Sequence, residues 1–145
     1  DARRVPYNLP HFPLHAGKPV WMVAGEKDAD TALALGLLGT CSTEGEGQGW
    51  DDDTYCPYFA GRDVVIVPDN DAAGRKHAAR VAGALVMWSA ALSVRVVNLP
   101  GCGGACKDLS DLRALIKDDN KAAKAVLALA DAAPRWVPIR KGVPA

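Results

Sequence analysis

Two short apolar runs restrict the possible folds of this sequence more than any other feature. Residues 19–23 (PVWMV) and 63–67 (DVVIV) are apolar without alternation, which is typical of strands buried on both faces of a parallel sheet. Helical spacing of apolar residues follows each run, from about Asp28 and over residues 72–91. Strands that alternate with helices predict a parallel sheet joined by right-handed crossovers.

Weaker patterns complete the predicted fold. Strands are expected at residues 39–42 and 93–99, and helices at residues 109–116 and 122–132. We therefore predict the α/β class, with a Rossmann-like central parallel sheet of about four strands flanked by helices.

Length and Pro content predict the domain organisation. A chain of 145 residues fits one domain, which buries roughly two thirds of its unfolded surface on folding. Residues 1–18 carry three Pro and no periodicity, so we expect an extended lead-in, then one domain over 19–132 and a linker or tail over 133–145. The start without Met and the Pro-containing end favour a piece of a longer protein.

Charge and cysteine content exclude several classes of protein. The 17 Lys and Arg balance the 17 Asp and Glu, so binding to a polyanion such as DNA requires a local basic patch. No apolar run approaches the roughly 20 residues of a membrane span. The four Cys are irregularly spaced and do not indicate a disulfide scaffold, so a reducing cytoplasm is expected. Cys102 and Cys106 lack the second pair of ligands that a zinc site needs.

Acidic residues follow the strand over residues 63–67. Asp69 and Asp71 lie two apart in the motif PDNDAAG, where a slight turn lets both carboxylates face one cation. Hard cations such as Mg²⁺ prefer oxygen ligands, so the pair is a candidate metal site. Turn chemistry is an equal alternative from the local sequence, because Asp71 also suits the N-cap of the following helix.

A third acidic cluster, KDLSD at residues 107–111, follows the next strand by one loop. Because the carboxyl ends of parallel strands meet at one edge of the sheet, Asp108 and Asp111 are expected near the first pair. The alternative is a helix cap, with Asp108 at the N-cap and Asp111 three residues later, and both roles can coexist.

Four basic residues border the same predicted crevice. Arg75 and Lys76 lie early in the long helix, where the helix dipole disfavours cations unless a phosphate is close. Lys27 and Lys107 complete a small basic rim around the acidic centre. For each residue taken singly, a solvated helix face is an equally good explanation.

The Gly-rich segment at residues 44–50 (EGEGQGW) lacks the GK[ST] ending of a phosphate-binding P-loop. We interpret it as a flexible flap. Trp50 and the nearby Tyr55 could stack on bases, but packing is the favoured role for both.

Three motifs in this order resemble one known family. They are AGEKDADTALALG at residues 24–36, VVIVPDNDAAGRKHAARVAGAL at residues 64–85 and KDLSDL at residues 107–112. Together they resemble the Toprim domain of bacterial and phage primases, topoisomerases and some nucleases. The resemblance covers roughly residues 19–117, and PDNDAAGRKHA is most similar to the primase-helicase proteins of phages and plasmids.

The resemblance implies a set of site residues and partners. It implies Mg²⁺, or Mn²⁺, held by Asp69 and Asp71, with the region of Asp108 and Asp111 serving a second metal or the substrate. Gly25 and Asp28 match further signature positions of the family. The implied partners are a DNA or RNA template and nucleoside triphosphates. In such proteins a zinc-binding module often precedes the domain and a RecA-like helicase often follows it.

One position departs from the family pattern. The family carries a Glu before Gly25, as metal ligand or general acid and base, and this chain has Ala24 there. Glu26 is a different position and does not replace it. Ala24 is explained either by a deliberate change that removes activity or by a natural domain that is catalytically silent. The expected function is Mg-dependent primer synthesis by the parent protein, with phosphodiester cleavage or silent nucleic-acid binding as alternatives.

Overall fold

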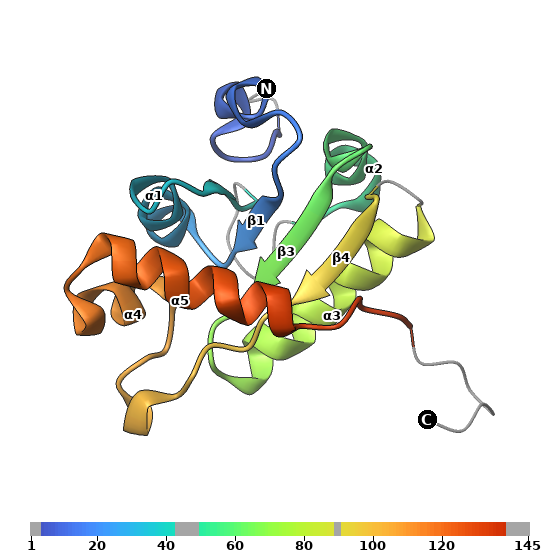
Figure 1. Cartoon of the computed structure of the whole chain (residues 1–145). Helices are drawn as coiled ribbons and strands as arrows, with labels where there is room; N and C mark the ends of the chain where they lie inside the picture. Colours follow the sequence, from blue (N-terminus) through green and yellow to red (C-terminus); the bar gives the residue numbers. More distant parts are fainter. Residues whose placement is uncertain (1–3, 43–49, 89–90, 139–145) are drawn as a thin grey trace.

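A computed structural model describes residues 4–42, 50–88 and 91–138 of the chain. A parallel sheet of four strands, in the order β2-β1-β3-β4, lies between two layers of helices (Figure 1). The predicted α/β, Rossmann-like fold with about four parallel strands is therefore confirmed. The predicted flap at residues 44–50 lies outside the described residues except for Trp50.

Most elements lie where the sequence pattern predicts them. The strands are β1 (Val20–Val23), β2 (Leu38–Thr40), β3 (Asp63–Val67) and β4 (Ser93–Val96), and the helices are α1 (Glu26–Ala34), α2 (Asp52–Tyr55), α3 (Ala72–Met87), α4 (Leu109–Ile116) and α5 (Asp119–Ala132). Within the described ranges, none of these helices has the length and apolar character needed to cross a membrane.

The lead-in is not extended as predicted. It forms two short 3-10 turns, Leu9–His11 and Pro13–His15. The first turn begins after Asn8, whose φ of 63° places it in the left-handed region that Asn tolerates better than most residues. Tyr7 N–H donates to the Cys41 carbonyl over 3.0 Å, which ties this segment to the end of β2.

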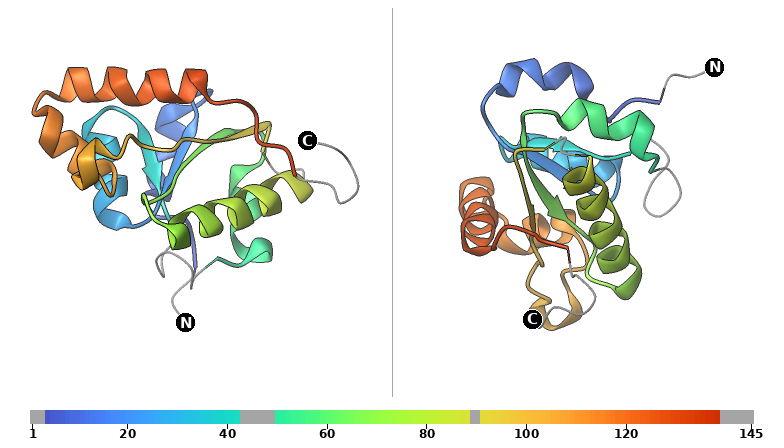
Figure 2. Two further views of the ribbon diagram at one scale, coloured as in Figure 1. Left: turned by 90° about the horizontal axis from the view of Figure 1, so that it is seen from below. Right: turned by 90° about the vertical axis from the view of Figure 1, so that its right-hand side faces the viewer.

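Helices cover both faces of the sheet (Figure 2), and each face has its own apolar core. One core packs α1, α4 and α5 against Trp21 and Val65, and it includes the buried thiol of Cys41. The other packs α3 and the α2 segment against the opposite face, and it includes the buried thiol of Cys56. Trp50 stacks on Tyr55 in this second core, with ring centroids 5.1 Å apart, so the predicted packing role is confirmed.

The strand order places a switch point between β1 and β3. From β1 the chain crosses to β2 on one side and then returns to β3 on the other side. In open α/β sheets, ligands bind at such a point, outside the carboxyl ends of the strands. The topology therefore selects the segments that follow β1 and β3, and the segment after the neighbouring strand β4 begins at the same edge of the sheet.

The segment after α5 runs along the outer edge of the sheet. Arg135 forms an antiparallel bridge with Arg95 of β4, and Trp136 N–H donates to the Val94 carbonyl over 2.7 Å. This part of the predicted tail therefore pairs with the edge strand.

Candidate metal centre

Three carboxylates meet at the switch point. Asp28, Asp69 and Asp108 each offer an oxygen atom, and these atoms lie within 4.8 Å of one another. They come from α1, from the turn after β3 and from the position before α4. Carboxylate oxygens at this spacing can hold a metal ion, and we call these three residues the acidic triad.

Asp28 is the most buried member, with 5% of its surface exposed. Its Oδ1 accepts hydrogen bonds from Ser110 N–H over 3.1 Å and from Ser110 Oγ over 2.6 Å. These contacts join α1 to the first turn of α4. Burial raises the pKa of the Asp28 carboxyl, and the hydrogen bonds from Ser110 oppose that rise.

Asp69 lies close to both other members of the triad. Burial is the main cause that raises the pKa of the Asp69 carboxyl, followed by the charges of Asp28 and Asp108. Three acids therefore repel one another in a partly buried site. A bound cation would remove that repulsion, so the electrostatics fit a metal as well as the geometry does.

Asp71 is an N-cap in this structure. Its Oδ1 accepts a hydrogen bond from Gly74 N–H over 2.6 Å, and its Oδ2 lies 3.8 Å from Lys107 Nζ. The capping alternative is thus confirmed for Asp71. The acidic triad does not include Asp71, and it includes Asp28, which the family resemblance gave as a signature position.

The start of α3 packs closely on Asp69. A Cβ atom on Gly74 would lie 2.5 Å from the Asp69 carbonyl oxygen and 3.1 Å from its backbone nitrogen. Only glycine fits this approach, since real Cβ atoms do not come that near to backbone atoms. Gly74 therefore sets the position of Asp69 relative to the helix.

Asp108 and Asp111 form a reciprocal capping box. Asp108 Oδ1 accepts from Asp111 N–H over 2.8 Å, and Asp111 Oδ2 accepts from Asp108 N–H over 3.3 Å and from Lys107 N–H over 3.0 Å. The capping prediction is confirmed for both residues. Asp108 also belongs to the acidic triad, whereas the structure gives Asp111 only the capping role.

The four basic residues separate into two pairs. Lys27 Nζ lies 3.1 Å from Asp108 Oδ2, and that contact raises the pKa of Lys27. Lys107 is near Asp71, so both lysines border the acids as predicted. Arg75 and Lys76 are exposed in the first turns of α3 and form no ion pair with a described residue.

Ala24 lies at the same edge, directly after β1. It is partly exposed and borders a cavity of about 10 Å³ that His77 also lines. Gly25 is the N-cap of α1 in extended conformation, and open space surrounds the position of an added Cβ. Because Ala24 is itself partly exposed, a longer side chain at this position can reach solvent.

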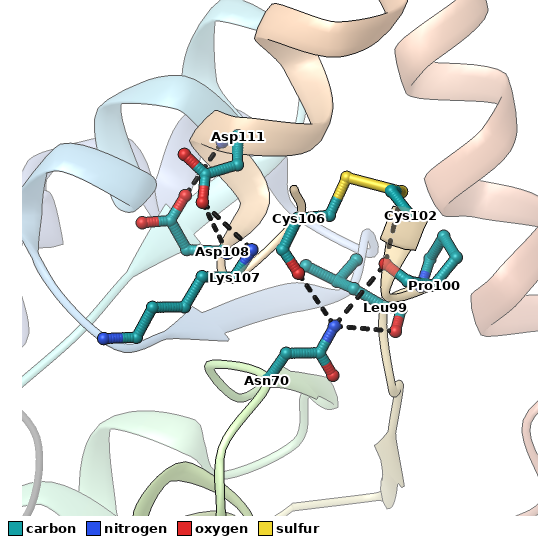
Figure 3. The surroundings of a disulfide bond; sticks show 8 residues. All are labelled: Asn70, Leu99, Pro100, Cys102, Cys106, Lys107, Asp108 and Asp111. Carbon is teal, nitrogen blue, oxygen red and sulfur yellow. Dashed lines mark hydrogen bonds between the residues drawn. A yellow bond between two sulfur atoms is a disulfide. The ribbon is translucent and has the colours of Figure 1, made fainter. Parts of the chain in front are cut away.

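Asn70 anchors the loop that carries Asp108 (Figure 3). Its Nδ2 donates to the carbonyls of Leu99 over 3.0 Å and Cys106 over 2.9 Å, and its N–H donates to the Lys107 carbonyl over 2.7 Å. A disulfide between Cys102 and Cys106 closes the loop. The cysteine spacing did not indicate this disulfide.

Comparison of the sequence with protein-family models and with curated proteins gave no match. The resemblance to the Toprim family therefore rests on the three motifs quoted above. Residues from each motif meet in the acidic triad.

Proposed function

We propose that the chain is a Toprim-type domain that binds Mg²⁺ or Mn²⁺ and that its parent protein joins nucleotides into primers. The observation that carries the proposal is the convergence of Asp28, Asp69 and Asp108 at the sheet edge where α/β folds bind ligands. The motif order supplies the link to nucleic-acid chemistry.

Mg²⁺ fits this donor set, because the ion usually takes one or two carboxylates, several waters and substrate phosphates. When bound, such an ion neutralises phosphate charge and activates an attacking hydroxyl. The chain itself holds the acidic triad in place and brings positively charged side chains to the phosphates. Lys27 and Lys107 border the acids, and Arg75 and Lys76 offer exposed charge at the start of α3.

The implied substrates are nucleoside triphosphates with a DNA or RNA template, and the parent is proposed to carry a zinc-binding module and a RecA-like helicase. Phosphodiester cleavage is an alternative, since the same site serves hydrolysis when water attacks. A catalytically silent binding module is the other alternative, and Ala24 is the observation that favours it, because a methyl group neither binds a cation nor moves a proton.

Ala24→Glu tests the proposal directly. The added carboxylate should tighten Mn²⁺ binding by about tenfold or more, measured by calorimetry, because it brings a further oxygen to the metal edge. In the full-length parent, the same change should raise product formation by about 10²-fold to 10⁴-fold, the usual contribution of a positioned acid or base. Electrophoresis of the products separates primers from cut ends.

Ala79→Glu is the matched control, because Ala79 is exposed in the middle of α3. It adds the same charge away from the triad and should change neither property. If Ala24→Glu and Ala79→Glu both leave Mn²⁺ affinity and activity unchanged, the chain is a silent binding module and the catalytic proposal is wrong.

Nucleic-acid binding is expected to be weak and strongly dependent on salt, because the net charge is zero and the basic rim is small. Arg75→Ala with Lys76→Ala should lower the log-log salt slope by about 0.7 to 0.9 for each phosphate group that the variant no longer neutralises. Fluorescence anisotropy of a labelled single strand at several salt concentrations measures the slope.

The control replaces Lys121 and Lys124, which are exposed on α5, by Ala. This variant removes equal charge from a surface away from the carboxyl ends of the strands. Equal slopes for the two double variants would assign Arg75 and Lys76 to the solvated helix surface.

A further inference from the structure

A second concave site lies at the opposite end of the sheet from the acidic triad. It is a cavity of about 310 Å³ between the amino ends of β1, β3 and β4 and the last turns of α5. Trp21 and Val65 lie on its sheet side, and Leu127 and Ala130 on its helix side. A volume near 300 Å³ is at the lower end of the range for small-molecule sites.

Two guanidinium groups line this cavity. The antiparallel bridge between Arg95 and Arg135 places their side chains on the same face, where like charges repel. Neither residue forms an ion pair within 4.0 Å with any residue in the described part of the chain. Among the described residues, the pair therefore has no counter-ion at ion-pair distance, although Asp63 and Asp131 line the same cavity.

The hydrogen bonds of Arg95 are also incomplete. One of its five N–H donors, on Nη1, reaches the Ala130 carbonyl near the end of α5 over 3.3 Å. Its Nε is buried and has no hydrogen-bond partner. Because Nε itself has almost no accessible surface, an anion in the cavity would bind the Nη donors of Arg95 that the bond to Ala130 leaves free.

The geometry points to a binding site for a small organic anion, whose carboxylate or phosphate group lies between Arg95 and Arg135. Guanidinium groups bind both kinds of anion through paired hydrogen bonds. The apolar body of the ligand packs against Trp21 and Leu127. This site is separate from the acidic triad, and it does not depend on the proposed primer synthesis.

Two acids on the cavity wall limit the charge that it accepts. Asp63 accepts a hydrogen bond from Ser93 Oγ over 2.5 Å, so part of its capacity is used within the protein. Asp131 is exposed at the end of α5. Its charge opposes an anion, so removing it should strengthen binding.

Nuclear magnetic resonance with simple probes tests the site on this chain. Phenyl phosphate or benzoate should shift the indole resonance of Trp21 and the Nε resonances of Arg95 and Arg135 with one common saturation curve. Benzyl alcohol supplies the same ring without charge and should bind at least about tenfold more weakly, as expected when a charge-assisted hydrogen bond is absent. Inorganic phosphate alone shows what the anion contributes without the ring.

The two anionic probes distinguish the source of the ligand group. Preference for phenyl phosphate assigns a phosphate ligand, and preference for benzoate assigns a carboxylate ligand. The inference would be overturned if benzyl alcohol bound as tightly as the anions. It would also be overturned if neither anion shifted the resonances of these three residues at about 10 mM, which is ten times a Kd of about 1 mM.

Three variants locate the anion. Arg135→Gln should weaken phenyl phosphate binding by about tenfold, and Arg135 is exposed, so the core stays intact. Lys124→Gln is the control. It also removes one positive charge, but from a residue of α5 that does not line the cavity, and it should leave phenyl phosphate binding unchanged. Asp131→Asn should tighten binding. Equal affinities for the Arg135→Gln and Lys124→Gln variants would overturn the site.

Discussion

Asp69→Asn is expected to lower Mn²⁺ affinity by about 100-fold or more. Loss of a residue that only hydrogen-bonds to a metal ligand already lowers metal affinity by about 10-fold to 100-fold, and Asp69 is proposed to be a ligand itself. The same variant should unfold at a higher temperature than the parent chain when no cation is present. The reason is that burial and the charges of Asp28 and Asp108 raise the pKa of Asp69, so its ionised form destabilises the folded chain. Calorimetry and thermal unfolding with and without Mn²⁺ measure both effects.

The pH dependence follows from the same residues. Because the pKa values of Asp28 and Asp69 are raised on folding, the folded chain binds protons more readily than the unfolded chain. Their contribution therefore increases stability as pH falls from above the raised pKa values toward the ordinary range of Asp. Asp69→Asn should remove part of this dependence of stability on pH. Added Mn²⁺ should reverse its direction, so that stability falls as the pH is lowered.

Asp71→Asn is the matched control for that experiment. Asn caps helices about as well as Asp, so the bond from Gly74 N–H should survive, and Asp71 is outside the acidic triad. Mn²⁺ affinity should stay within about twofold of the parent value, a difference below about 0.5 kcal/mol. If Asp71→Asn weakens binding as much as Asp69→Asn, the metal lies between Asp69 and Asp71, and Asp28 only anchors α4.

Gly74→Ala is the second change with a large expected effect. The added methyl would overlap the backbone of Asp69, with 2.5 Å to its carbonyl oxygen, so either α3 or Asp69 has to move. We expect the free energy of unfolding to fall by about 3 kcal/mol, the upper part of the range for overpacked sites. Mn²⁺ affinity should also fall, because the displaced residue belongs to the triad.

Gly83→Ala provides the comparison within the same helix. Its added Cβ would meet only Trp136 Cη2, at an ordinary 3.7 Å. In the middle of α3 this change should raise stability by about 0.5 to 1 kcal/mol through helix propensity. Denaturant unfolding of both variants measures the contrast. Similar stabilities would show that the start of α3 is not closely packed on Asp69.

The central sheet could be predicted because its inner strands are buried on both faces. The sequences of β1 and β3 are continuous apolar runs, which predict buried strands. The helical spacing of apolar residues predicted α3 and α4. The α2 segment and the turn Cys56–Phe59 were missed, because their buried aromatic residues stand among Asp and Pro in a short, aperiodic stretch. Such a segment is ordered by tertiary packing rather than by local pattern.

The sequence predicted metal ligands at this edge of the sheet, and two of the predicted residues, Asp69 and Asp108, belong to the acidic triad. Asp69 and Asp108 were proposed because each follows a strand, and Asp71 because of its spacing to Asp69. Asp28 was named only as a signature position of the resemblance. A signal for Asp28 was present in the sequence. It occupies a position one helical turn before Ala32, on the buried side of α1, where an acid requires partners.

The two buried thiols give each face of the sheet a chemical reporter. Burial raises the pKa of Cys41 to about 12 and that of Cys56 to about 11, so near neutral pH almost none of either is the reactive thiolate. Alkylation at either position therefore requires the surrounding layer to open. Cys41 belongs to the core beneath α1, α4 and α5, and Cys56 belongs to the core beneath α3 and the α2 segment. Mass spectrometry of labelled peptides can therefore tell which layer separates from the sheet first.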